Sequence, residues 1–317
     1  MPSSIKILVA IALMPALSYA QKIDQTASFR SLTKESYFRF SYDNDYFSAT
    51  DYYYTQGYSF ELAHPGLKRN PLNKLLPGLK DSSDTYAIAF EHFGFSPTSI
   101  RHEEILRGDR PFAACLILKS YKVSTDRKRR LRLSSLLSTG VMGPAAIGGE
   151  MQETIHRWIG GVEPKGWQNQ IRNGVIINYD LNLEKAAFTS KYLNINYNGN
   201  LRVGTLNTKL QSGATVVVGR YANTFDLKLK KKYKFYVFSQ PLVNLIAHDA
   251  TLQGDFFTKS PYTIKSSAVK RVNLQHNFGA IVQLNKVYLE YYKTFIGKEF
   301  ETGKSHRWGG LKIGFVI

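Results

Sequence analysis

The chain ends on the stretch "WGGLKIGFVI" (residues 308–317), in which large apolar side chains alternate with small or charged ones. Leu311, Ile313 and Phe315 point to one side of an extended strand, and Lys312 points to the other, because successive side chains of a strand face opposite ways. A last strand that is apolar on one face and small or polar on the other is typical of an outer-membrane β-barrel. A soluble exported β protein can also end this way, so the rest of the chain has to decide.

The same two-residue alternation recurs along the whole chain and predicts about twelve strands. The expected ranges are 37–43, 55–63, 85–93, 113–123, 130–140, 172–183, 191–202, 210–221, 234–248, 269–284, 287–295 and 308–317. An even number of strands closes an antiparallel barrel with both termini at the periplasmic end. We therefore predict an all-β, transmembrane antiparallel β-barrel that forms a single domain over residues 21–317.

The first twenty residues, "MPSSIKILVAIALMPALSYA", predict a secretory signal peptide. Lys6 precedes an apolar run, and small residues lead up to the expected cleavage after Ala20. The run is too short to cross a membrane as a helix. Cys115 is the only cysteine, so an intrachain disulfide is excluded.

The net charge of the 317-residue chain is +18, and removal of the signal peptide takes away Lys6 and no acid, which leaves 41 − 24 = +17. An exported protein rarely meets nucleic acid, so we expect no nucleic-acid partner. Anionic lipid headgroups or the phosphates of lipopolysaccharide are the expected partners in the outer membrane. We expect the barrel to be a monomer.

The predicted topology gathers unusual polar residues at one rim of the barrel. With the N-terminus on the periplasmic side, the connections after strands 1, 3 and 5 face outward. These are "DNDYFSATDYYYTQG" (43–57), "FSPTSIRHEEILRGDRP" (95–111) and the connection 141–171, which contains a predicted helix from about 149 to 159. The connection 64–84, rich in Pro, Gly, Lys and Leu, also interrupts the strand pattern, and the sequence gives it no purpose.

Two side chains of the predicted helix have the chemistry of a hydrolytic site. Gln152 and His156 are four residues apart and therefore share one helical face. A histidine can take a proton from water near neutral pH, and a glutamine can orient it or donate to an oxyanion. A surface pair on an ordinary helix has the same spacing, and spacing alone leaves that alternative open.

The first outer connection offers hard oxygen ligands from Asp43, Asn44 and Asp45, which suit calcium rather than zinc. The spacing is not that of an EF-hand, because the central glycine and the closing glutamate are missing. Strand alternation would turn Asp43 and Asp45 to one face and Asn44 to the other, unless the strand bulges. A polar strand end with local side-chain turns remains an equal alternative.

The second outer connection offers cations for an anionic substrate. Arg101, Arg107 and Arg110 lie within it, and the planar guanidinium group can hold a phosphate at two points. We predict that these three arginines bind substrate.

The outer connections resemble the outer-membrane lipid A 3'-O-deacylase family. The matching pieces, in the family's order, are "NDYF" (44–47), "TDYYYTQG" (50–57), "GDRPFAA" (108–114), "GVMGPAAIGGEMQETIHRWIG" (140–160) and "GWQNQ" (166–170). The resemblance covers essentially the mature chain, and it implies a twelve-stranded barrel with its site between barrel wall and lipid, near the outer leaflet. It also implies calcium-dependent hydrolysis of the acyl (acyloxyacyl) group ester-linked at the 3' position of lipid A in lipopolysaccharide.

The motifs carry the family's site onto five positions of this chain. These positions are Asn44, Asp45, Thr55, Gln152 and His156. The resemblance implies that His156 is the general base on a water, that Asp45 binds calcium or orients the histidine, and that Thr55 or Gln152 holds the oxyanion or substrate. The family pattern places an acidic residue shortly after the histidine.

At the position where the family has its acidic residue this chain has Val162, with Glu163 one position later, so the acidic role is not carried over.

Two rival functions remain. One is an outer-membrane phospholipase with a hydroxyl nucleophile, for which we find no strong serine motif beside His156. The other is a non-enzymatic barrel of the same descent.

Overall fold

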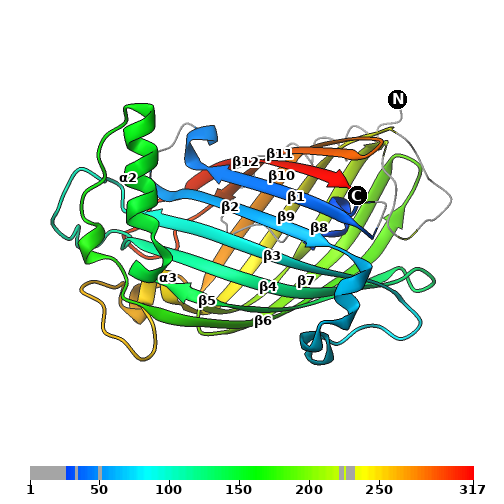
Figure 1. The fold of residues 1–317 in the computed structure, drawn as a ribbon, viewed down its shortest axis with the longest axis horizontal. Coiled ribbons are helices and arrows are strands. Elements are labelled where there is room, and N and C mark those ends of the chain that lie inside the picture. The colour runs from blue at the N-terminus through cyan, green and yellow to red at the C-terminus, as the bar shows by residue number, and fades with distance from the viewer. Residues whose placement is uncertain (1–25, 33–34, 49–51, 221–224, 226–232) are drawn as a thin grey trace.

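The computed structural model describes residues 26–32, 35–48, 52–220, 225 and 233–317, so the predicted signal peptide lies outside it. Twelve strands form a closed antiparallel barrel in which consecutive strands pair and β1 pairs with β12 (Figure 1). The strands are β1 Tyr37–Asn44, β2 Tyr53–Ala63, β3 Ser83–Ser96, β4 Ala113–Asp126, β5 Leu131–Met142, β6 Gly174–Thr189, β7 Leu193–Gly204, β8 Asn207–Arg220, β9 Tyr233–Asp249, β10 Val272–Leu284, β11 Val287–Ile296 and β12 His306–Val316. The predicted fold and strand number are confirmed.

Short helices occupy the connections. They are η1 Ser28–Arg30, η2 Asp45–Ser48, η3 Pro65–Arg69, η4 Pro71–Leu75, η5 Pro144–Ala146, α2 Gly148–Ile159, η6 Trp167–Asn169, α3 Ala250–Gln253 and η7 Ser266–Ala268. Within the described residues, none of the helices has the length and apolar character needed to span a membrane. Helices α2 and α3 lie at one end of the barrel and the C-terminus at the other (Figure 1). We call the first end the α2 rim.

The alternation of apolar and polar side chains in the last strand corresponds to the two faces of the barrel wall. Leu311, Ile313 and Phe315 are exposed on the outside of the barrel, whereas Lys312 is buried inside, where its Nζ donates to Ser41 Oγ at 3.1 Å. The outer surface is therefore apolar and the lumen polar, as the wall of a membrane barrel requires.

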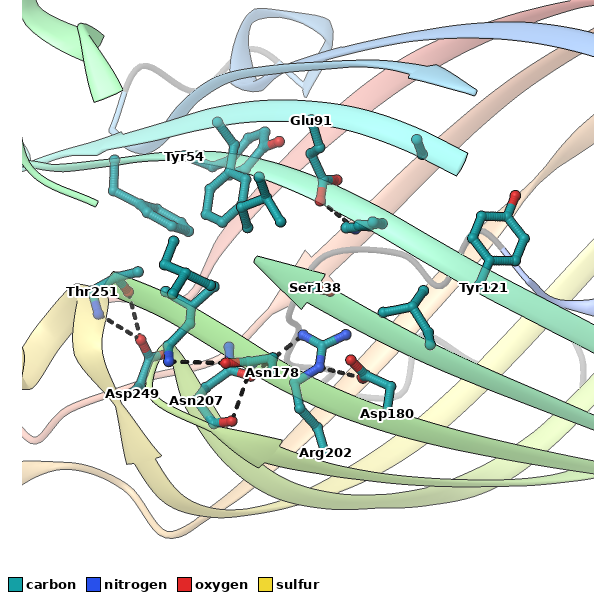
Figure 2. Close-up of a pocket in the computed structure, with 18 of the residues that line it drawn as sticks. Tyr54, Glu91, Tyr121, Ser138, Asn178, Asp180, Arg202, Asn207, Asp249 and Thr251 are labelled. Atoms are coloured by element: carbon teal, nitrogen blue, oxygen red, sulfur yellow. Dashed lines mark hydrogen bonds and ion pairs between the residues drawn. The ribbon is translucent and has the colours of Figure 1, made fainter. Parts of the chain in front are cut away.

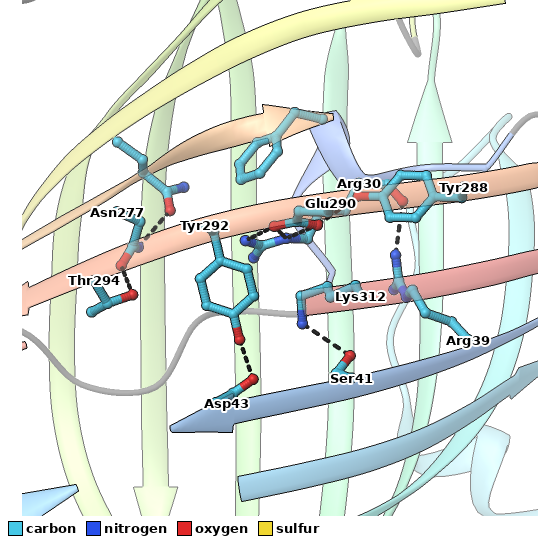
Figure 3. Close-up of polar contacts among 12 residues, drawn as sticks. Arg30, Arg39, Ser41, Asp43, Asn277, Tyr288, Glu290, Tyr292, Thr294 and Lys312 are labelled. Atoms are coloured by element: carbon cyan, nitrogen blue, oxygen red, sulfur yellow. Dashed lines mark hydrogen bonds and ion pairs between the residues drawn. The ribbon is translucent and has the colours of Figure 1, made fainter. Parts of the chain in front are cut away.

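The N-terminal residues 26–32, here called the lumen segment, lie inside the barrel, and their contacts to Glu290, Arg39 and Arg132 place them in the half away from the α2 rim. Figure 3 shows Arg30 among these partners. Arg30 is fully buried and its Nε donates to Glu290 of β11 at 2.9 Å. Arg39 of β1 donates from Nη1 to the carbonyl oxygen of Arg30, also at 2.9 Å. Phe29 stacks on Phe238 of β9 with ring centroids 4.2 Å apart.

The opposite side of the lumen holds the same segment. Arg132 of β5 donates from Nη2 to the carbonyl oxygen of Thr26 at 2.9 Å, and Glu184 of β6 accepts from the backbone N–H of Ser28 at 2.9 Å. Contacts to strands all around the barrel show that the lumen segment bridges the lumen, so it fills space that the wall side chains alone leave open.

Candidate active site

Four residues of the barrel wall form a row on its outer face at the α2 rim. Asn44 pairs with Gln56, Gln56 with Gly94, and Gly94 with Ala114, so the row crosses β1 to β4. Directly opposed residues of antiparallel strands have Cα atoms about 4.5–5.5 Å apart. The row faces away from the lumen, because side chains one position away, such as Phe93, line the lumen instead.

Helix α2 and Trp167 lie against the Gly94 and Ala114 part of this row, where the wall residues are small. A Cβ atom on Gly148 would clash with the side chain of Ala114, and one on Gly149 would lie 3.2 Å from the indole of Trp167. The same indole ends 3.8 Å from the Cβ position of Gly94. The glycines of the motif at 140–160 therefore let the helix approach the strands, and they place its polar face beside the wall.

Gln152 is buried on this helix, and its orientation is fixed. The indole Nε1–H of Trp167 donates to Gln152 Oε1 at 2.7 Å. An amide whose oxygen already accepts a hydrogen bond presents its NH₂ group as a donor to whatever lies on its other side. Gln152 is therefore set up to donate.

His156 follows one turn later and is held through one ring nitrogen. Its Nδ1 lies 2.5 Å from the carbonyl oxygen of Val162. Gly160 ends the helix with a left-handed φ of 64°, and the N–H of Gly161 donates to the carbonyl oxygen of His156 at 2.8 Å, which turns the chain back toward the ring. A carbonyl oxygen can only accept, so this contact assigns the donor role to Nδ1, and in the neutral imidazole Nε2 is then the nitrogen with the lone pair.

The other predicted catalytic residues lie at the ends of β1 and β2. Asn44 ends β1 on the outer face, and its Oδ1 accepts from the backbone N–H of Tyr46 at 2.7 Å. Asp45 begins η2 and is buried. Thr55 occupies an irregularity in the pairing of β2 with β3, and its Oγ1 lies 2.7 Å from Ser96 Oγ.

Asp43 does not fit the predicted metal site. It points into the lumen, where the hydroxyl groups of Tyr292 and Tyr54 donate to its two carboxylate oxygens, the second at 3.3 Å (Figure 3). Strand alternation is the reason, because no bulge turns Asp43 toward the face that carries Asn44. Among the residues that the structure describes, no three His, Cys, Asp or Glu side chains form a group that could hold a metal. Asp45 and Asn44 remain as hard oxygen donors.

The three predicted substrate-binding arginines divide into two groups. Arg101 and Arg107 are exposed in the connection between β3 and β4. Arg110 is buried, forms an ion pair with Glu299 and donates from Nη2 to Thr251 Oγ1 at 2.7 Å. Its guanidinium group braces the connections at the α2 rim, which does not fit the prediction that Arg110 binds substrate. Burial raises the pKa of Glu299 to about 7 although Arg110 opposes the shift.

A cavity of about 80 Å³ lies inside the lumen near the α2 rim, and it is a second place where polar groups meet (Figure 2). Its charged side chains are paired across the strands, as in the ion pairs of Lys119 with Glu91 and of Arg202 with Asp180. A lipid in the membrane reaches the outer face of the wall and not the closed lumen. The outer face therefore remains the better candidate for chemistry on lipid.

Three residues of the site were missed as individual candidates, although each belongs to a quoted motif or flanks one. Trp167 orients Gln152, Ser96 pairs with Thr55, and Gln56 stands between Asn44 and Gly94 in the wall row. Their roles depend on strand register and on a long-range contact, so the sequence pattern of a single strand does not reveal them.

The family model described as "Outer membrane protein LpxR" matches residues 5–317. The chain belongs to the LpxR family. This is the lipid A 3'-O-deacylase family that the motifs resemble, so that prediction is confirmed, and the chain is an outer-membrane protein. None of the curated proteins compared with the chain matches it in sequence.

Among solved structures, LpxR from Salmonella typhimurium has 22% sequence identity to the chain and a TM-score of 0.73, with 89% of this chain and 100% of that one covered. That likeness supports the LpxR-like fold. The β domain of the Bordetella autotransporter BrkA covers 89% of this chain and 99% of its own, at 8% identity and a TM-score of 0.45. This second likeness is too low to carry any argument.

Proposed function

We propose that the protein is an esterase that removes the acyl (acyloxyacyl) group linked at the 3' position of lipid A, with the α2 rim at the outer leaflet. Membership of the LpxR family supports the substrate class. The observation that carries the proposal is the state of His156. Its Nδ1 lies 2.5 Å from the carbonyl oxygen of Val162, which can only accept, and among the described residues Nε2 has no hydrogen-bond partner.

The proposed reaction begins at that free nitrogen. His156 Nε2 takes a proton from a water molecule, and the resulting hydroxide attacks the carbonyl carbon of the ester. The tetrahedral intermediate then breaks its bond to the sugar oxygen, and the imidazolium of His156 returns the proton to that oxygen. The products are a fatty acid and a free 3'-hydroxyl group, so atoms and charges balance without a covalent enzyme intermediate.

The negative charge that develops on the carbonyl oxygen needs donors. The NH₂ group of Gln152 is available because Trp167 occupies the amide oxygen. Thr55 can also donate, with Ser96 as the partner that orients its hydroxyl. Removing one such donor typically slows the chemical step about 10²–10³-fold.

Calcium is part of the proposal, with Asp45 and Asn44 as its protein ligands. Calcium binds six to eight oxygens and accepts backbone carbonyls and water among them. The carboxylate of Asp45 and the amide oxygen of Asn44 are therefore compatible with part of a calcium coordination shell. Asp43 is left out because the tyrosines in the lumen hold it. When bound, the ion supplies positive charge that polarises the ester carbonyl.

The surface around His156 suits a lipid substrate. Trp158 is 80% exposed and Ile159 71% exposed at the end of α2. Large apolar and aromatic side chains near the membrane surface contact the boundary between lipid headgroups and acyl chains. Arg101 and Arg107, both exposed in the adjacent connection, are the proposed contacts for the phosphates of lipid A.

The test is release of fatty acid from lipid A by the purified, detergent-folded protein. His156→Ala should retain the barrel and lose about 10²–10⁴-fold in rate, which is the usual cost of a positioned base. His102→Ala is the matched control, since His102 is an exposed histidine of the neighbouring connection. Heat-modifiable gel mobility confirms folding of both variants.

Three outcomes would contradict the proposal. Near-wild-type turnover of His156→Ala would show that another residue is the base. Faster release from glycerophospholipid than from lipid A would favour the phospholipase. No release from either lipid, in calcium and with a folded protein, would favour the non-enzymatic barrel.

A further inference from the structure

The connection between β2 and β3, residues 64–82, folds back along the outside of the barrel. It forms η3 and η4 instead of a tight turn. Asn70 Nδ2 donates to Ser120 Oγ of β4 at 3.2 Å, and Ser135 of β5 donates from Oγ to the carbonyl oxygen of Pro77 at 2.7 Å. The segment is thus attached to the wall by side chains of separate strands.

A third hydrogen bond extends this attachment to β6, where Tyr179 donates from its hydroxyl to the carbonyl oxygen of Leu75 at 2.7 Å. Ser120, Ser135 and Tyr179 all point away from the lumen, because the alternate side chains of their strands line it. Hydroxyl groups on the outer face of a membrane barrel are unusual neighbours for exposed residues such as Leu118. Here two of them donate to backbone carbonyl oxygens of residues 64–82, and the hydroxyl of Ser120 accepts from the Asn70 side chain.

The outward surface of the segment combines positive charge with apolar side chains. Its exposed cations are Lys68, Arg69, Lys74 and Lys80. Asp81 is its one acidic residue. Leu72 and Leu75 are 40% and 59% exposed beside these cations, although a soluble surface gains nothing from exposing leucine on a short helical turn.

The position of residues 64–82 on the barrel indicates what their exposed cations and leucines contact. Helix η4 lies outside the strands in the half of the barrel away from the α2 rim (Figure 1). Long connections mark the extracellular end of an outer-membrane barrel and short turns the periplasmic end, so the opposite end is the periplasmic one. Residues 64–82 leave β2 and enter β3 at this end and lie against the lipid-facing wall on the side of the inner leaflet.

We propose that residues 64–82 bind anionic phospholipid headgroups of the periplasmic leaflet. Lys68, Arg69 and Lys74 contact the headgroup phosphates, and Leu72 and Leu75 enter the boundary between headgroups and acyl chains. Basic residues beside apolar ones on a short surface helix are the pattern by which proteins recognise anionic lipid at an interface. The proposal is independent of the chemistry at His156, because the two surfaces are at opposite ends of the barrel.

The test compares retention of phosphatidylglycerol with that of phosphatidylcholine by the full-length folded barrel, using mixed-lipid nanodiscs and native mass spectrometry. Near a membrane surface each cation strengthens binding about fivefold, so a triple variant of Lys68→Gln, Arg69→Gln and Lys74→Gln should lose about 10²-fold in preference for phosphatidylglycerol. Leu72→Ser with Leu75→Ser should weaken retention of both lipids while leaving the charges intact.

The matched control removes three exposed cations from the turn between β4 and β5 at the same end of the barrel, by Arg127→Gln, Lys128→Gln and Arg129→Gln. This variant should keep its lipid preference within about fivefold of the wild type. Equal loss in both triple variants would show bulk attraction to charge and overturn the proposal. No preference of the wild-type protein for phosphatidylglycerol would overturn it as well.

Discussion

Replacement of Arg30 by methionine tests the lumen segment, because Arg30 joins it to the wall. The side chains of Arg30 and Glu290 are both 0% exposed, and Nε and Nη2 of the arginine both donate to the glutamate. Loss of Arg30 leaves the carboxylate of Glu290 buried without its ion-pair partner and with the hydroxyl of Tyr288 as a neutral donor, and breaking a buried ion pair in this way costs about 3–5 kcal/mol. We therefore expect Arg30→Met to lower the free energy of unfolding by that amount.

The double variant Arg30→Met with Glu290→Met separates this cause from loss of packing. Replacing a buried ion pair by apolar side chains of similar size is often neutral or stabilising. The double variant should therefore recover most of the loss, as measured by urea unfolding of the detergent-folded barrel followed by tryptophan fluorescence. A single variant within 1 kcal/mol of wild type, or a double variant as unstable as the single one, would refute this account of the segment.

The other predictions concern the lumen, the rim and the site. Deletion of residues 26–32 should open the lumen to ions, and planar bilayers should show a conductance that the wild type lacks; equal conductance would mean that the segment does not seal it. The pKa of Glu299 is raised from 4.5 to about 7, so its contribution to stability is present below pH 4.5 and is lost as the pH rises toward 7. Glu299→Gln should therefore remove the fall of the unfolding temperature between pH 4.5 and 7. An unchanged pH dependence would exclude this carboxyl as its cause. Gln152→Ala should slow ester hydrolysis about 10²–10³-fold with little change in KM, whereas an equal loss in kcat and gain in KM would point to misfolding of α2. Chelation should abolish hydrolysis and calcium should restore it, and full turnover after chelation would exclude the metal.

The sequence predicts the barrel well because the side chains of each strand alternate between apolar ones that face lipid and polar or small ones that face the lumen. Lys312 between Leu311 and Ile313 shows which face is the lumen, and turn residues such as Asn285 mark the strand ends. The predicted helix over 149–159 agrees with α2 to within one residue, because glycines bound it on both sides.

The site is only partly predictable because it depends on contacts between distant segments. Alternation already placed Asp43 on the face opposite Asn44, but nothing in the sequence showed that tyrosines of β2 and β11 would hold its carboxylate. Arg110 and Arg101 belong to the same predicted connection, and the sequence does not distinguish them. Only the fold shows that Arg110 is buried against Glu299, which belongs to the connection between β11 and β12. Residues 26–32 show no strand pattern, so their place inside the lumen could not be read from the sequence.

The most direct test of the central claim is mass spectrometry of lipid A from Gram-negative cells that express the wild-type protein or His156→Ala. The account predicts that the wild type yields lipid A lighter by the acyl group at the 3' position, with that position free. His156→Ala, present in the outer membrane at the same level, should leave lipid A intact. Identical lipid A spectra from the two strains, whether both intact or both shortened, would contradict the claim that this site removes the 3'-linked acyl group.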